Sequence, residues 1–244
     1  DIDVSLTVDG TIKLNGNYPT GTDNVALGNA ALSSGSLSGA GNIAIGDSAA
    51  AALTTGSNAI AIGRDAMSGA VFTGSDSVAV GRSALAAVTS GSNNVAIGGL
   101  ALSATNSGAG NVAVGLNALT ANQTGSTAVA IGYNALAADV TVEESTAVGT
   151  NALMAQTSGR NHAFGFRALQ DLTGGTYNTA VGGETLENIQ GGDYNTAIGG
   201  FAGRAAVSGD FNFYGGYQAG LSNTVDGNVM VGYQAGSTTT TGAH

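Results

Sequence analysis

A short pattern of apolar and small residues recurs along almost the whole chain. It has the form Asn-apolar-Ala-apolar-Gly, as in Asn-Ile-Ala-Ile-Gly at 42–46 and Asn-Val-Ala-Val-Gly at 111–115. The thirteen copies, some of them weaker, end at Gly28, Gly46, Gly63, Gly81, Gly98, Gly115, Gly132, Gly149, Gly165, Gly182, Gly199, Gly216 and Gly232. The 204 residues between the first and the last of these glycines make 12 steps that average 17, and each step is 16, 17 or 18 residues. Such even spacing indicates one structural unit that is repeated.

We number positions in each repeat from its final glycine, which is position 0. Alanine occupies −2 in 11 of 13 copies, with Tyr214 and Met230 as the exceptions, and −1 is Val, Ile, Leu or Phe in 12. Alanine also occupies +3 in 12 copies, leucine +4 in 8, asparagine −4 in 9 and glycine −7 in 10. Position −3 is apolar in 9 copies. The other four copies carry Thr146, His162, Thr179 and Thr196 at −3.

The columns at −3 to −1 predict a short strand, because β-branched residues on either side of a small one match the two-residue period of a strand. Helices fit poorly: 17 residues are too few for two helices and two turns, and each glycine inside a helix costs about 1 kcal/mol. Glycines at 0 and −7 are expected to supply positive-φ turns. The fold class predicted is therefore all-β, a parallel β-solenoid of about 13 coils, each with room for two short strands, forming a rod roughly 60 Å long.

Both faces of the predicted strand are apolar or small. Parallel strands of this kind are normally covered on both faces. We therefore expect one face to fill the coil and the other to pack against neighbouring chains, and the pattern alone does not say which face carries the alanine column. The repeat domain is expected to span 21–236, between a lead-in strand or cap at 1–20 and a flexible Thr-rich tail at 237–244.

Composition excludes several classes of protein. Glycine accounts for 41 of 244 residues and proline for one, so a collagen is excluded. Charged residues are only 9%, which argues against a disordered chain. The net charge of −10 would repel nucleic acid, and no apolar run is long enough for membrane insertion. The absence of cysteine excludes disulfides and thiolate chemistry.

Catalytic constellations are weak. Glu143 with Glu144, and Glu184 with Glu187, are interpreted as solvated loop charges, and His162 as a structural residue of the −3 column. We therefore predict that the protein is not an enzyme and has no cofactor or metal site. Asp193, Asp210 and Asp226 share position −6 in consecutive coils, about 5 Å apart. This column is interpreted as exposed, screened carboxylates in preference to a cation site.

Aromatic residues gather in the C-terminal part of the chain. Tyr177, Tyr194 and Phe211 share position −5 in consecutive coils, and Tyr217 and Tyr233 share +1. Space-filling within a wider fibre is one interpretation. The other is a receptor-binding surface, in which the rings stack on sugars while Asp193 and Asp210 accept hydrogen bonds from hydroxyl groups.

The repeat resembles two known groups of proteins. Segments such as Asn94-Val-Ala-Ile-Gly98 and Asn195-Thr-Ala-Ile-Gly199 are similar to the Val-Ala-Ile-Gly head repeats of YadA-like trimeric autotransporter adhesins, and to repeats in fibre proteins of bacteriophages and bacterial surfaces. The segments Asp9–Leu14 and Gly16–Pro19 also resemble phage fibre proteins. The resemblance extends over about residues 20–237 and implies a left-handed parallel β-roll, assembled as a homotrimer on a virion or bacterial cell surface.

Two functions follow as hypotheses. The first is an extracellular structural and adhesive fibre that presents or forms a surface for attachment to a host-cell glycan or other receptor. The alternative is a monomeric solenoid that binds a ligand, such as an ice-binding protein. An ice-binding face should carry threonine in one column across many coils, whereas the best column here has three threonines interrupted by His162.

Overall fold

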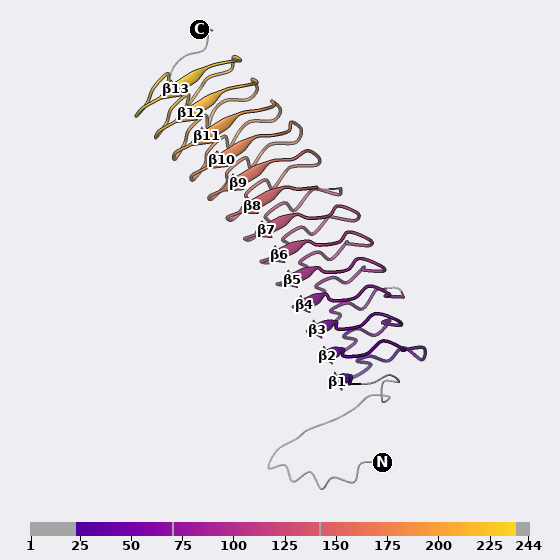
Figure 1. Cartoon of the computed structure of the whole chain (residues 1–244). Coiled ribbons are helices and arrows are strands. Elements are labelled where there is room, and N and C mark those ends of the chain that lie inside the picture. Colours follow the sequence, from indigo (N-terminus) through magenta and orange to yellow (C-terminus); the bar gives the residue numbers. More distant parts are fainter. Residues whose placement is uncertain (1–22, 70, 142, 238–244) are drawn as a thin grey trace, which may run out of the picture.

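The computed structural model describes residues 23–69, 71–141 and 143–237, and there the chain winds into a parallel β-solenoid of about 12 turns (Figure 1). Each repeat contributes one three-residue strand, and all the strands join in sequence order in one parallel sheet. The strands are β1 (Val25–Leu27), β2 (Ile43–Ile45), β3 (Ile60–Ile62), β4 (Val78–Val80), β5 (Val95–Ile97), β6 (Val112–Val114), β7 (Val129–Ile131), β8 (Thr146–Val148), β9 (His162–Phe164), β10 (Thr179–Val181), β11 (Thr196–Ile198), β12 (Phe213–Gly215) and β13 (Val229–Val231). The lead-in at 1–20, and the tail beyond residue 237, lie outside the described residues.

The strand register confirms the columns that define the repeat. Ala113 of β6 pairs with Ala96 on one side and with Ala130 on the other, so equal positions stack along the rod. The prediction of two strands in each coil is wrong, since each coil has one. After the strand the backbone adopts positive φ at +2 and +4, as at Asn117 (φ 59°) and Leu119 (φ 51°), and such alternation prevents an extended segment.

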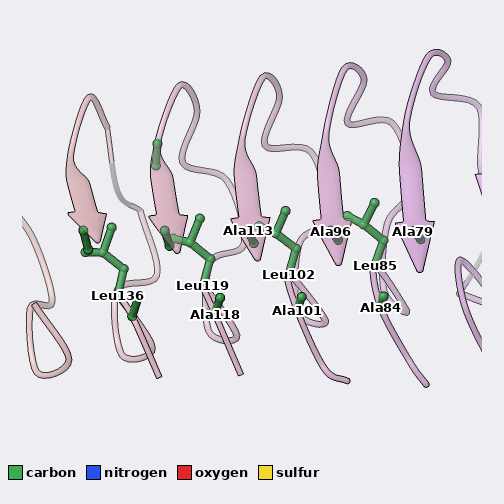
Figure 2. Packing of buried hydrophobic residues seen from close by; sticks show 14 of the residues in the cluster. Ala79, Ala84, Leu85, Ala96, Ala101, Leu102, Ala113, Ala118, Leu119 and Leu136 are labelled. Carbon is green, nitrogen blue, oxygen red and sulfur yellow. The ribbon is translucent and has the colours of Figure 1, made fainter. Parts of the chain in front are cut away.

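The alanine column faces the interior of the coil. Ala113 is fully buried, together with Ala118 at +3 and Leu119 at +4 (Figure 2). Valine and isoleucine at −3 and −1 therefore point away from the interior. The alanine face of the strand is therefore the inner one. The narrow space inside the coil holds the alanine methyl group and the leucine side chain.

The asparagines at −4 form a buried ladder along the rod. Asn94 donates its side-chain amide to the carbonyl oxygen of Gly108 at 2.8 Å, and its Oδ1 accepts the backbone N–H of Asn111 at 2.9 Å. Asn94 thus satisfies two backbone groups of the next coil that are shielded from water, and Asn111 does the same. From Asn161 onward the side chains also bond to one another, as Asn178 Nδ2 does to Asn161 Oδ1 at 3.0 Å.

Glycine is required at 0 and −7 for two different reasons. Gly115, at position 0, has φ 134°, and a Cβ there would lie 2.5 Å from the carbonyl oxygen of Gly132. The predicted positive φ at −7 is found at Gly175, Gly192 and Gly209 but not at Gly108. A Cβ at Gly108 would lie 2.2 Å from the carbonyl oxygen of Gly125, so close approach between coils excludes a side chain at this position.

Tyr214 breaks the alanine column without breaking the fold. It is 1% exposed inside the coil of β12, and its hydroxyl group accepts a hydrogen bond from Asn223 Nδ2 at 2.8 Å. The space for its ring arises at position +4, where Gly203 and Gly220 replace leucine. Three positions thus change together to keep the interior filled.

Candidate binding surface

The aromatic residues at −5 form a stacked column on the surface of the rod. The ring centroids of Tyr177 and Tyr194 are 5.1 Å apart and those of Tyr194 and Phe211 are 5.2 Å apart, with interplanar angles of 17° and 3°. The three residues are 47%, 50% and 62% exposed. The sequence therefore predicted the stacking correctly, and the rings do not fill the interior of this chain.

The backbone at −5 does not favour aromatic residues. Tyr177, Tyr194 and Phe211 have φ of 61°, 58° and 58°, a left-handed conformation that is uncommon for bulky side chains. Earlier coils carry Asn58 and Gly110 at this position, which are residue types that tolerate it. The local backbone therefore gives no reason for three consecutive aromatic residues.

The aspartates at −6 are joined to the backbone. The Oδ1 atoms of Asp193, Asp210 and Asp226 each accept a backbone N–H of the preceding coil at 2.8 Å, from Thr176, Asp193 and Asp210 respectively. In an earlier coil the hydroxyl oxygen of Ser126 accepts the N–H of Ala109 in the same way. The column is thus a structural ladder with one oxygen of each carboxylate fixed, which the interpretation as merely screened charges did not foresee. Among the described residues, no group of three metal-ligating side chains is found.

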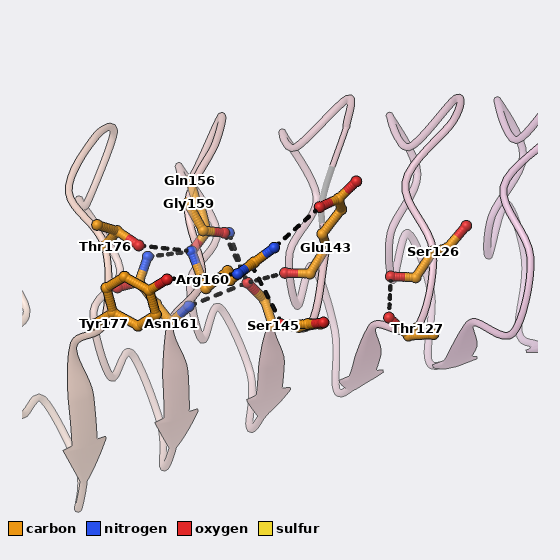
Figure 3. A network of polar contacts seen from close by, with 11 residues as sticks. Ser126, Thr127, Glu143, Ser145, Gln156, Gly159, Arg160, Asn161, Thr176 and Tyr177 are labelled. Carbon is orange, nitrogen blue, oxygen red and sulfur yellow. Dashed lines mark hydrogen bonds and ion pairs between the residues drawn. The ribbon is translucent and has the colours of Figure 1, made fainter.

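An open hollow of about 440 Å³ lies at the N-terminal end of the aromatic column. Figure 3 shows the polar contacts around Arg160 and Tyr177, two of the residues that line it. Arg160 takes position −5 directly before Tyr177, and its Nη1 donates to the Tyr177 hydroxyl at 3.5 Å. The same guanidinium group pairs with Glu143 at 3.5 Å and Glu144 at 3.3 Å. The hollow is lined by Thr141, Glu143, Gly159, Arg160, Thr176 and Tyr177. Sequence reasoning did not single out Arg160, although the repeat numbering places it beside Tyr177.

Buried polar side chains lie inside the coils next to this hollow. Asp139 accepts hydrogen bonds from Gln156 Nε2 at 2.8 Å and from the backbone N–H of Thr141 at 3.0 Å. Gln156 also donates to Ser145 Oγ and to the carbonyl oxygen of Gly159, both at 3.1 Å. Burial raises the pKa of Asp139 above its ordinary value, and the hydrogen bonds from Gln156 and Thr141 oppose the rise. Sequence reasoning did not foresee this interior network.

Tyr217 and Tyr233 form a separate column. Their ring centroids are 5.8 Å apart, and Phe201 contacts Tyr217 edge-on at 5.5 Å. Position +1 follows the strand whereas −5 precedes it, so six residues of mostly extended chain, up to roughly 20 Å, separate the two columns. The structure therefore divides the seven predicted receptor-binding residues. Tyr177, Tyr194, Phe211, Asp193 and Asp210 lie together, and Tyr217 and Tyr233 lie across the strand.

The remaining glutamates are ion-paired. Arg204 pairs with Glu184 at 3.0 Å and with Glu187 at 2.8 Å, and Arg167 pairs with Glu187 at 3.4 Å. Glu187 is only 5% exposed, so its interpretation as a solvated loop charge is wrong. The interaction with two arginines offsets the cost of burying its carboxylate.

The second surface feature is the outer face of the sheet, which we define as the −3 and −1 residues of β1–β13. Most of these residues are apolar and partly exposed, with values of 41% for Ile97, 47% for Ile198 and 76% for Val229. His162 lies in this face between Thr146 and Thr179, with which it pairs in register. In a single chain, a parallel sheet thus presents one apolar face to water.

Comparison with protein-family models, curated proteins and solved structures finds no match for this chain. No helix in the described part of the chain is long and apolar enough to cross a membrane.

Proposed function

We propose that the protein is a structural and adhesive surface fibre, a homotrimer of left-handed β-rolls that presents a receptor-binding surface outside a virion or a bacterial cell. The observation that carries the proposal is the outer face of the sheet. Thirteen strands at about 4.8 Å make an apolar strip roughly 58 Å long. Monomeric soluble proteins rarely expose contiguous apolar patches larger than a few hundred Å².

The size of the outer face suits self-association. With side chains covering a width of about 10 Å, the strip has a projected area near 600 Å², and its corrugated accessible area is larger. A standard protein interface buries about 800 Å² on each partner. Three such faces around a common axis would cover one another and leave the turns, including the −5 and −6 columns, at the surface. The resemblance to trimeric adhesin heads and phage fibres favours three chains over two.

The mass of the purified chain in solution tests the assembly. Light scattering should give three times 23.5 kDa. Val112→Glu with Val114→Glu places two charges on the outer face in β6, and we expect this variant to dissociate. Gln123→Glu, in an exposed turn, is the matched control and should remain trimeric. A monomeric parent chain would refute the trimer and favour the alternative function.

Adhesion is tested by binding to whole cells and to a glycan panel. Replacing Tyr177, Tyr194 and Phe211 together by serine should abolish binding while the assembly is kept, because the three rings are exposed and contribute little to the interior. If this variant binds as well as the parent, the aromatic column serves only for packing and the chain belongs to the shaft of the fibre. The proposed fibre has no catalytic role.

The alternative, a monomeric ice-binding solenoid, draws support from one observation. Thr146, Thr179 and Thr196 lie on the outer face, which is exposed in a single chain. However, these threonines occupy only a short part of the face and His162 interrupts them, so the adhesive fibre is the function we favour.

A further inference from the structure

The C-terminal end of the aromatic column, at Phe211, differs from the rest of the column. The rings are nearly parallel, with centroids 5.1 and 5.2 Å apart and interplanar angles of 17° and 3°. The middle ring, Tyr194, therefore has an aromatic neighbour on each face. Phe211 is the last ring and, at 62%, the most exposed of the three.

The next coil places Gly227 at position −5, directly after Phe211 in the column. Gly227 has φ 72°, close to the conformation of the aromatic residues before it, yet it has no side chain to continue the stack. Among the residues that the structure describes, a Cβ built at Gly227 meets nothing within 4 Å. In this described part of the chain, the outer face of the Phe211 ring thus borders open space of about the height of one further ring.

One carboxylate is fixed beside the Phe211 ring. Asp226 Oδ1 accepts the backbone N–H of Asp210 at 2.8 Å, which holds the carboxylate at the level of Phe211. The Asp210 carboxylate accepts the N–H of Asp193 in the same way, so it lies one coil closer to the N-terminus, at the level of Tyr194. Asp226 is exposed, and its second oxygen can accept a hydrogen bond from a ligand that lies on the Phe211 ring. An apolar ring with a fixed polar acceptor beside it is the usual composition of a site for a small ligand.

We propose that the outer face of Phe211, with Asp226 beside it, binds one uncharged pyranose ring of a surface polysaccharide, which continues the aromatic stack at the level of Gly227. The C–H face of a pyranose packs on an aromatic ring, and its hydroxyl groups donate to carboxylate oxygens. Three aspartates in consecutive coils would repel a sugar that carries a carboxylate or sulfate group. This inference rests on the proposed adhesive function and names the class of receptor.

A substitution at Gly227 tests the proposed sugar site directly. Gly227→Tyr should extend the column by one ring, because Tyr177 and Tyr194 adopt nearly the same backbone conformation, and the new ring should cover Phe211. We expect the variant to remain assembled and to lose at least tenfold in affinity for neutral glycans. The matched control is Gly110→Tyr, at the same position of an earlier coil, where φ is 69° and a Cβ makes only an ordinary contact with Thr127.

The probes are an immobilised panel of neutral and acidic oligosaccharides and whole cells. Binding of neutral glycans by the parent and by Gly110→Tyr, but not by Gly227→Tyr, would support the site. Equal binding by all three proteins, a preference for acidic glycans, or binding to cells but to no glycan in the panel would overturn the site and leave the adhesive function standing. A parent protein that binds neither cells nor glycans would overturn both.

Discussion

Three substitutions should convert the interior around β12 into that of an ordinary coil, with alanine at −2 and leucine at +4. Tyr214 fills space that leucines occupy elsewhere. Removing the ring by Tyr214→Ala should cost about 3–5 kcal/mol in free energy of unfolding, the range found for large aromatic-to-alanine changes in cores. Restoring Ala at −2 and Leu at +4 through Tyr214→Ala, Gly203→Leu and Gly220→Leu should recover most of that loss.

The distances between Tyr214 and the two glycines determine how strongly the three substitutions are coupled. In the parent, a Cβ at Gly220 would lie 2.3 Å from Tyr214 Cδ1, and one at Gly203 would lie 2.8 Å from Cδ2. Either Gly→Leu change alone therefore overpacks the coil and should cost at least 1–3 kcal/mol. Both glycines have φ 60°, close to the 51° of Leu119, so the backbone already has the conformation that leucine adopts at +4 in other coils.

Thermal and denaturant unfolding of the parent, the single variants and the combined variant measure this coupling. We expect the combined variant to be more stable than Tyr214→Ala, although each Gly→Leu change destabilises the parent. Additive losses, with the combined variant the least stable of all, would refute the idea that Tyr214 and the two glycines share one space.

Three further predictions concern stability. Ala113→Leu should destabilise the protein by about 1–3 kcal/mol per chain, whereas Gln123→Leu, in an exposed turn, should change stability by no more than about 0.5 kcal/mol, and equal melting temperatures would contradict the column assignment. Because burial raises the pKa of Asp139, its protonated carboxyl group is favoured in the folded state. The resulting contribution to the free energy of unfolding is greatest below the ordinary pKa of 3.8 and is lost as the pH rises through the raised pKa. The stability of Asp139→Asn relative to the parent should therefore increase from pH 4 to pH 7, and a constant difference would contradict it. Burial also raises the pKa of Tyr214 to about 12, so the parent should lose about 2–3 kcal/mol relative to Tyr214→Phe as the pH rises from 10 through 12, and parallel alkaline melting curves would refute this.

The repeat made the solenoid predictable because each column has one physical role in every coil. Alanine at −2, as at Ala113, and leucine at +4, as at Leu119, recur about every 17 residues. The stacking of equal positions follows from that spacing alone. The second half of each coil was harder to predict. In the left-handed conformation, Asn117 and Leu119 donate their backbone N–H groups to Gly99 and Ala135 of the neighbouring coils. Leucine has no intrinsic preference for this conformation, so the sequence of one coil does not predict it.

The candidate site was predictable to the same extent. Equal positions stack, so the column of Tyr177, Tyr194 and Phe211 could be read directly from the sequence. The partners of the aspartates could not, because a shared position does not reveal which backbone N–H a carboxylate meets. Glu187 was misinterpreted for a similar reason: its arginine partners lie one coil away on either side, in turns whose shape the pattern does not specify.

The changes on the surface of the C-terminal coils are not demanded by folding. In a solenoid each coil contacts only its neighbours, so a position on the surface can vary in one coil without affecting distant coils. At −6, Ser126 makes the same backbone contact as Asp193, so the carboxylate is not needed for the ladder. At −5, Gly110 suits the backbone better than Tyr194. Two columns that depart from what the fold prefers, side by side and in the same coils, are better explained by a ligand that contacts both than by the stability of the rod.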